Sequence, residues 1–130
     1  VFSKDVMADL TYALKSVVNG GTGGAALALG RPAAGKTGTS QSNASAWFSA
    51  YTPQLAASVA LFRDSASESL NGIGGLTSVT GGTFPARIWT AFMKGALKDE
   101  PVMSFPAPAN IGGLEPVVMT SGGRQTMKKK

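Results

Sequence analysis

The sequence is 130 residues long, 43% hydrophobic, and contains neither cysteine nor histidine. This length suits one domain with a buried core. The missing residue types exclude disulfides, thiolate metal sites and nucleophile systems that rely on histidine. Four of the cations behind the net charge of +5, Arg124 and the lysines at 128–130, lie in the last seven residues, so the remainder carries only +1. We therefore expect no nucleic-acid partner, because such partners need clustered cations on an ordered face.

The sequence contains no run of about 18 or more apolar residues, the length that a membrane-spanning helix requires. We therefore expect any membrane anchor to lie outside this sequence. The sequence begins Val1-Phe2-Ser3, with no initiator methionine and no signal peptide, so we expect it to be part of a longer polypeptide or a processed product.

Residues 3–18 predict an amphipathic helix. Ser3 is a good N-cap, and Asp5 suits the positive end of the helix dipole. Apolar residues recur at helical spacing, which predicts a stripe that packs on the core. The members of this stripe are Val6, Leu10, Leu14 and Val17 or Val18. Asn19-Gly20-Gly21 predicts a left-handed stop.

Residues 34–40, Ala-Gly-Lys-Thr-Gly-Thr-Ser, are small or hydroxylated except for Lys36. In a strand, Thr37 and Thr39 share one face, and glycines at 35 and 38 let another molecule approach the backbone. Two hydroxyls, backbone amides and an ammonium can bind a carboxylate, through charge-assisted hydrogen bonds of about 1.5–3 kcal/mol each. On its own, so short a pattern more often marks an ordinary strand with a solvated lysine.

Residues 30–37 also fit the phosphate-loop pattern G-x-x-x-x-G-K-T, in which backbone amides and a lysine hold phosphates at the start of a helix. The context argues against this interpretation. Pro32 precedes the lysine where an apolar strand is needed, and residues 38–43 are poor helix starters. A nucleotide-binding fragment therefore stands as an alternative.

Residues 46–52 and 55–62 predict an antiparallel hairpin with a turn at Thr52-Pro53-Gln54. With the segment that contains Lys36, they predict a three-stranded meander. We expect the aromatic residues of the first run, Trp47, Phe48 and Tyr51, to pack in the core. Trp47, near the turn, has the alternative of lining a site.

The rest of the chain predicts a loop, a second helix and a tail. Asp64 and Glu68 are the only acids in residues 63–82, too few for a metal site, and we expect no metal or cofactor. Residues 85–98 predict a helix with Trp89 packed on the sheet and a broad apolar face. The other members of this face are Ile88, Phe92, Met93 and Leu97. From Asp99 we expect an extended, partly docked segment, with residues 109–130 forming a disordered Pro/Gly-rich and basic tail.

The order of these elements resembles the C-terminal half of the transpeptidase domain of penicillin-binding proteins, especially the bifunctional class A type. The resemblance is carried by residues 14–18 with Gly-Thr-Gly at 21–23, by residues 30–40, by residues 46–55 and by residues 81–89, in the family's order. It implies an α+β fold, the antiparallel sheet flanked by helices of serine β-lactamases and D,D-transpeptidases. Residues 1–108 would supply only its C-terminal part, a helix, a three-strand meander and a helix.

The resemblance also implies a function. The family cross-links peptidoglycan stem peptides by acyl transfer from D-Ala-D-Ala, binds penicillin and other β-lactams, and acts at the extracytoplasmic face of the bacterial membrane. Thr37 and Thr39 would bind the substrate carboxylate, and the Thr39 amide would complete the oxyanion hole. Lys36 would support proton transfer, and Gly38 would keep the strand open to substrate. Ser40 would complete the substrate-binding stretch.

Two parts of the family's site are not accounted for. We interpret the sequence as lacking the S-x-x-K and S-x-N motifs, which in the family lie ahead of Lys-Thr-Gly. An upstream half of the same polypeptide would then carry them, and the isolated chain would be inactive.

A flat pleat also places Lys36 opposite Thr37, so we expect a twisted strand at the border of the cleft. A non-catalytic cell-wall interaction module is a further alternative.

Overall fold

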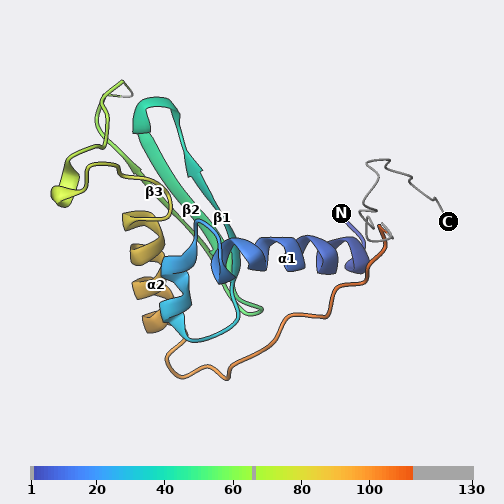
Figure 1. The fold of residues 1–130 in the computed structure, drawn as a ribbon. Coiled ribbons are helices and arrows are strands. Elements are labelled where there is room, and N and C mark those ends of the chain that lie inside the picture. The colour runs from blue at the N-terminus through green and yellow to red at the C-terminus, as the bar shows by residue number, and fades with distance from the viewer. Residues whose placement is uncertain (1, 66, 113–130) are drawn as a thin grey trace, which may run out of the picture.

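A computed structural model describes residues 2–65 and 67–112 of the chain, and in it a three-stranded antiparallel sheet lies between two helices (Figure 1). The elements are α1 (Lys4–Asn19), β1 (Ala34–Thr39), β2 (Ser45–Tyr51), β3 (Ala56–Phe62) and α2 (Phe84–Ala96), with short 3-10 turns at Gly24–Leu29, Gln41–Asn43 and Ile73–Gly75. The strands follow the order β1-β2-β3, and both pairs are antiparallel. The predicted meander between two helices, and with it the α+β fold class, is confirmed.

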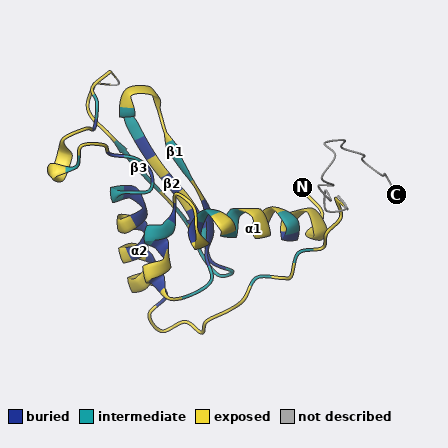
Figure 2. Ribbon diagram, in the orientation of Figure 1, coloured by how far each residue is buried: buried dark blue, intermediate teal, exposed yellow. Residues whose placement is uncertain are grey.

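The core lies between α2 and one face of the sheet, where the buried residues gather (Figure 2). Trp89 of α2 is fully buried, and its ring meets the ring of Phe48 edge-on, with centroids 5.4 Å apart. Its indole Nε1 donates to the carbonyl oxygens of Ala50 and Ala57, both at 3.2 Å. Those two residues are partners in the β2–β3 register. The predicted contact of Trp89 with the sheet is confirmed.

Helix α1 has the predicted start, but only part of its predicted apolar stripe is buried. The Ser3 hydroxyl accepts from the Val6 amide at 3.3 Å, as expected of an N-cap. Leu10, however, is 44% exposed, and α1 instead buries residues such as Thr11. The Thr11 hydroxyl lies 2.9 Å from the hydroxyl of Tyr51, on the sheet face opposite α2. The predicted core stripe is therefore wrong at Val6 and Leu10, which are exposed, and right at Val18, which is 2% exposed and belongs to the core.

Two further expectations about the helices are wrong. Ile88 and Phe92 of α2 are 45% and 54% exposed, so the helix has an apolar outer side in addition to its buried side. The end of α1 uses no left-handed residue, because Gly20 has a φ of −168°. The amides of Gly20 and Gly23 donate to the carbonyls of Ser16 and Val17 instead, which satisfies the helix terminus.

Residues 99–112 form no helix or strand and run from the end of α2 to the beginning of α1 (Figure 1). The guanidinium of Arg31 donates to the carbonyls of Leu97 and Glu100, at 3.0 and 3.3 Å, where the segment leaves α2. Phe105 then packs edge-on against Tyr51, with ring centroids 5.5 Å apart. The disorder predicted for residues 109–130 stays a prediction, because 113–130 lie outside the described residues. None of the helices in the described ranges is long and apolar enough to cross a membrane.

The far end of this segment is held by Asp9. The Asp9 carboxylate accepts from the backbone amides of Asn110 and Ile111, at 2.8 and 2.9 Å. The hydrogen bond from Asn110, together with that from Ile111 and against a desolvation effect, lowers the pKa of the Asp9 carboxyl from its ordinary value of 3.8. Because the pKa is lower in the folded state, this attachment is fully present above the ordinary pKa and is lost as pH falls through the lowered one.

Removing the carboxylate should therefore release residues 109–112 at neutral pH. We expect Asp9→Ala to speed hydrogen exchange at the Asn110 and Ile111 amides severalfold, because each amide loses its acceptor. Amide exchange followed by mass spectrometry checks this, with Asp5→Ala as the control, since Asp5 lies in the same helix. Unchanged exchange in Asp9→Ala would show that the contact does not hold the segment.

Candidate functional site at the edge of the sheet

Strand β1 is an edge strand of the described sheet, and its backbone directions decide what it offers to a ligand. The Ser40 amide donates to the Ser45 carbonyl at 3.0 Å, so the backbone of Ser40 points toward β2. Backbone groups alternate in direction along an antiparallel strand. The amides and carbonyls of Thr37 and Thr39 therefore point away from β2, toward the open edge. The Thr39 amide thus points away from β2, and the oxyanion role predicted for it stays a prediction.

The Lys36 ammonium reaches this same edge. Lys36 pairs with Ser49 and Thr37 with Phe48, so the two side chains leave β1 on opposite faces. The Lys36 side chain is exposed, and its Nζ donates to the Thr37 carbonyl at 2.9 Å. Because that carbonyl points to the open edge, the Lys36 ammonium also lies at the open edge. This contact brings Lys36 and Thr37 together at one site even though the pleat separates their side chains.

The hydroxyls of Thr37 and Thr39 lie on the α2 face of β1, and each has a partner from another loop. The Thr37 hydroxyl is 2.6 Å from the hydroxyl of Thr22, in the loop after α1. The Thr39 hydroxyl accepts from the Gly81 amide, in the loop before α2, at 3.2 Å. Thr22 and Gly81 lie within the stretches that resemble the family, but the sequence predicts no role for either residue. Spacing could not reveal it, because the partners are 15 and 42 residues apart.

The loop before α2 touches the strands so closely that two of its residues must be glycine. A Cβ at Gly81 would lie 2.1 Å from the Trp47 carbonyl oxygen and 2.8 Å from that of Gly38. A Cβ at Gly82 would lie 2.1 Å from the Thr22 carbonyl oxygen. Backbone atoms cannot yield as side-chain ends can, so this loop fixes the position of both β1 and the Thr22 loop.

Ser40 and Trp47, near the β1–β2 turn, make contacts that the sequence did not predict. The Ser40 hydroxyl accepts from the Ser45 amide at 2.7 Å and donates to the Ser45 carbonyl at 3.4 Å, so it closes the β1–β2 turn. Its substrate-binding role stays a prediction. Trp47 is 45% exposed, and the prediction that it packs in the core is wrong. Alternation along β2 explains this, because Phe48 takes the buried face and Trp47 the opposite one.

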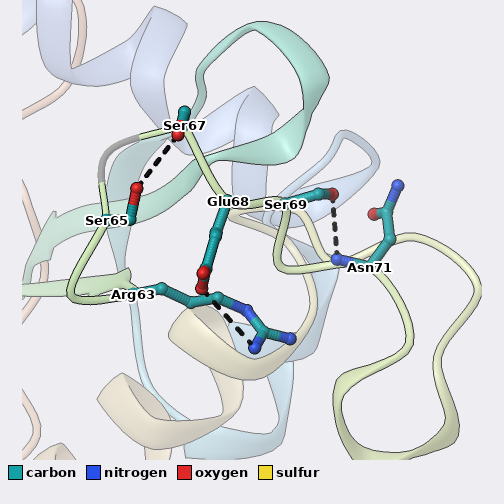
Figure 3. Close-up of polar contacts among 6 residues, drawn as sticks. All are labelled: Arg63, Ser65, Ser67, Glu68, Ser69 and Asn71. Atoms are coloured by element: carbon teal, nitrogen blue, oxygen red, sulfur yellow. Dashed lines mark hydrogen bonds and ion pairs between the residues drawn. The ribbon is translucent and has the colours of Figure 1, made fainter.

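The interpretation that the sequence lacks S-x-N needs a correction, because Ser69-Leu70-Asn71 has that spelling. These residues follow β3, whereas the family's motif precedes Lys-Thr-Gly. Figure 3 shows the Ser69 hydroxyl accepting from the Asn71 amide at 3.1 Å. The Asn71 side-chain oxygen accepts from the Asn43 side chain at 2.7 Å and from the Val79 amide at 3.3 Å. Ser69 and Asn71 thus fold their own loop against the β1–β2 turn.

Two neighbouring serines of this loop also form a hydrogen bond with each other. The hydroxyls of Ser65 and Ser67 lie 2.9 Å apart (Figure 3). The guanidinium of Arg63 meets the Glu68 carboxylate at 3.9 Å, and both side chains are largely exposed. Such a surface pair contributes about 0–1 kcal/mol. We find no lysine paired with a serine here that would replace S-x-x-K.

The phosphate-loop alternative is wrong. Lys36 lies inside β1, and the three-residue turn Gln41–Asn43 follows this strand where a phosphate loop requires a helix. Throughout residues 2–65 and 67–112, no three Asp or Glu side chains lie close enough together to hold a metal ion.

Comparison with known proteins identifies the family. The sequence profile described as penicillin binding protein transpeptidase domain matches residues 1–70. Penicillin-binding protein 1A of Mycolicibacterium smegmatis is 38% identical over 115 residues, which make up 85% of this chain and 14% of that protein. Penicillin-binding protein 1A of Pseudomonas aeruginosa is 38% identical over 106 residues, 81% of this chain and 12% of that protein. The chain thus spans a small part of the curated relatives it matches.

Solved structures agree in fold. The penicillin-binding protein PonA1 from Mycobacterium tuberculosis superimposes with a TM-score of 0.77 at 33% identity, covering 92% of this chain and 34% of that one. PonA1 in complex with penicillin V superimposes with a TM-score of 0.74 at 36% identity, covering 84% of this chain and 30% of that one. The expected resemblance and its β-lactamase-like fold are confirmed, and the chain belongs to the penicillin-binding protein transpeptidase domain family.

Proposed function

We propose that this chain forms one wall of the acyl-transfer site of a peptidoglycan D,D-transpeptidase. The observation that carries the proposal is the set of hydrogen-bond donors that β1 provides within four residues, at its open edge and on its α2 face. The Lys36 ammonium, the Thr39 amide and the hydroxyls of Thr37 and Thr39 belong to one short strand. Such a set suits an anion, either a bound carboxylate or a developing oxyanion.

In this proposal the substrate is the D-Ala-D-Ala end of a stem peptide. The hydroxyls of Thr37 and Thr39 bind its terminal carboxylate, and Lys36 adds positive potential. A serine from an upstream half of the same polypeptide attacks the penultimate carbonyl, and the Thr39 amide stabilises the oxyanion together with that serine's own amide. D-Ala leaves, and an amine of a neighbouring stem peptide resolves the acyl-enzyme. β-Lactams stop at the acyl stage.

In the same proposal, the polypeptide has two parts that contribute to the site, and the protein has a defined location in the cell. Residues 1–108 are the C-terminal portion of the transpeptidase domain, and residues 109–130 are a tail. The nucleophile motifs S-x-x-K and S-x-N lie in the upstream half. The protein works at the extracytoplasmic face of the bacterial membrane, with any anchor outside this chain. The family membership of the chain and the donor set of β1 support this assignment.

Fluorescent penicillin provides the test. We expect covalent labelling of the intact polypeptide and none of the isolated 130-residue chain, because the serine is supplied from upstream. Mixing the purified chain with a separately expressed upstream half should restore labelling on the upstream half. Heat-denatured protein is the control for non-specific attachment.

Two outcomes would contradict the proposal. Covalent labelling of the isolated chain would place a nucleophile within it, and the division of the site would be wrong. An intact polypeptide that is folded but never labelled would favour the remaining alternative, a non-catalytic cell-wall interaction module.

A further inference from the structure

The hydroxyl of Thr22 is hydrogen-bonded to the candidate substrate-binding hydroxyl of Thr37, with the two oxygens 2.6 Å apart. A hydroxyl has one hydrogen to donate and two lone pairs that accept. If Thr37 donated to Thr22, its only hydrogen would be used within the protein. A carboxylate only accepts hydrogen bonds, so Thr37 can bind one only when Thr22 is the donor of this pair.

The second hydroxyl of the strand has the same arrangement. The Thr39 oxygen accepts from the backbone amide of Gly81 at 3.2 Å, and an amide can only donate. The hydrogen of Thr39 therefore stays available for a ligand. The Gly81 amide thus makes the Thr39 hydroxyl an acceptor within the protein and leaves it a donor toward a ligand. Thr22 would do the same for the Thr37 hydroxyl. The two threonine hydroxyls and the Lys36 ammonium would then all act as hydrogen-bond donors toward a ligand bound at β1.

The loop that holds Thr22 is fixed on both sides. The Gly23 amide donates to the Val17 carbonyl at 2.8 Å, which ties the loop to the end of α1. A Cβ at Gly23 would lie 2.9 Å from the Phe48 ring. On the other side, a Cβ at Gly82 would lie 2.1 Å from the Thr22 carbonyl oxygen. The loop thus has little room to shift, and a donor fixed in this way is preorganised before substrate arrives.

We propose that Thr22 is a positioning residue that orients the Thr37 hydroxyl to donate to the substrate carboxylate, and so makes the site selective for carboxylate-bearing ligands. This inference rests on the proposed transpeptidase function and adds a determinant outside the Lys36 strand. Thr22 does not touch the substrate in this scheme. Its hydroxyl acts only through Thr37.

The test compares acylation of the intact polypeptide by benzylpenicillin with acylation by benzylpenicillin methyl ester, which lacks the carboxylate. Thr22→Val keeps the size of the side chain and removes the donor. We expect it to lower the second-order acylation rate constant for benzylpenicillin about tenfold, equivalent to about 1.4 kcal/mol. For the ester we expect a change of less than about twofold, as for surface substitutions in general. Both rates refer to the same folded protein, so their ratio is independent of any misfolded fraction.

Two further variants complete the design. Thr22→Ser retains the hydroxyl and should restore the rate for benzylpenicillin to within about twofold of the original. Thr77→Val makes the same chemical change at an exposed threonine of the loop before α2 and should leave both rates unchanged.

The outcomes separate the two claims. Equal slowing of the acid and the ester in Thr22→Val, an unchanged rate for the acid, or failure of Thr22→Ser to restore it would each overturn the positioning role. An original protein that benzylpenicillin does not acylate would instead overturn the proposed function on which this inference rests.

Discussion

Gly81→Ala is expected to impair both the stability and the activity of the intact polypeptide. The new methyl group would lie 2.1 Å from the Trp47 carbonyl oxygen and 3.0 Å from the Gly38 nitrogen, so the loop must move away from the strands. Overpacking of this kind costs about 1–3 kcal/mol, and occasionally more. The same movement withdraws the amide that Thr39 accepts from. Because a displacement of about 1 Å can cost roughly 100-fold in rate, we expect penicillin acylation to fall by about that factor.

Gly95→Ala is the matched control for this substitution. Gly95 lies in α2, and a Cβ there would meet nothing within 4 Å. Alanine favours a helix over glycine by about 1 kcal/mol, so Gly95→Ala should be neutral or stabilising and should leave acylation unchanged. The measurement compares the penicillin acylation rates and the urea unfolding midpoints of the unsubstituted protein, Gly81→Ala and Gly95→Ala. If Gly81→Ala behaves like Gly95→Ala, the close packing of this loop does not position β1.

Local patterns were sufficient to predict much of this fold. The Ser3 cap predicted the start of α1, and Thr52-Pro53-Gln54 predicted the turn between β2 and β3. Side-chain alternation predicted that Thr37 and Thr39 share a face, and the pairing with β2 agrees. These features depend on residues a few positions apart, whose effects on the backbone are steric and local.

Local patterns could not predict which side of each helix is buried, or which residues contact the candidate site. Periodicity marks a helix side as apolar but does not say which neighbour covers it, as Leu10 and Phe92 show by their exposure. The hydroxyl pair of Thr22 and Thr37 depends on how a loop after α1 meets a strand. Gly81 is required by a contact with the backbone of Trp47, a distance that no composition rule encodes. Tertiary packing decides all of these.

Trp89→Ala is expected to have the largest effect on stability. Trp89 is fully buried between α2 and the sheet, and truncating such a residue costs about 3–5 kcal/mol through lost burial and the cavity left behind. The indole also donates to the carbonyls of Ala50 and Ala57, and so joins α2 to both β2 and β3. Loss of that donor leaves these carbonyls with one partner fewer. A domain with a total stability of about 5–15 kcal/mol would lose much of it.

A graded series tests whether burial and the indole donor both contribute. Trp89→Phe keeps most of the apolar volume and removes the donor, so we expect it to cost about 1–3 kcal/mol, clearly less than Trp89→Ala. Lys94→Ala, an exposed position on the same helix, should change stability by less than about 0.5 kcal/mol. Pulse proteolysis of the intact polypeptide in urea measures all three without relying on tryptophan fluorescence. Equal midpoints for Trp89→Ala and Lys94→Ala would place the stabilising core elsewhere than between α2 and the sheet.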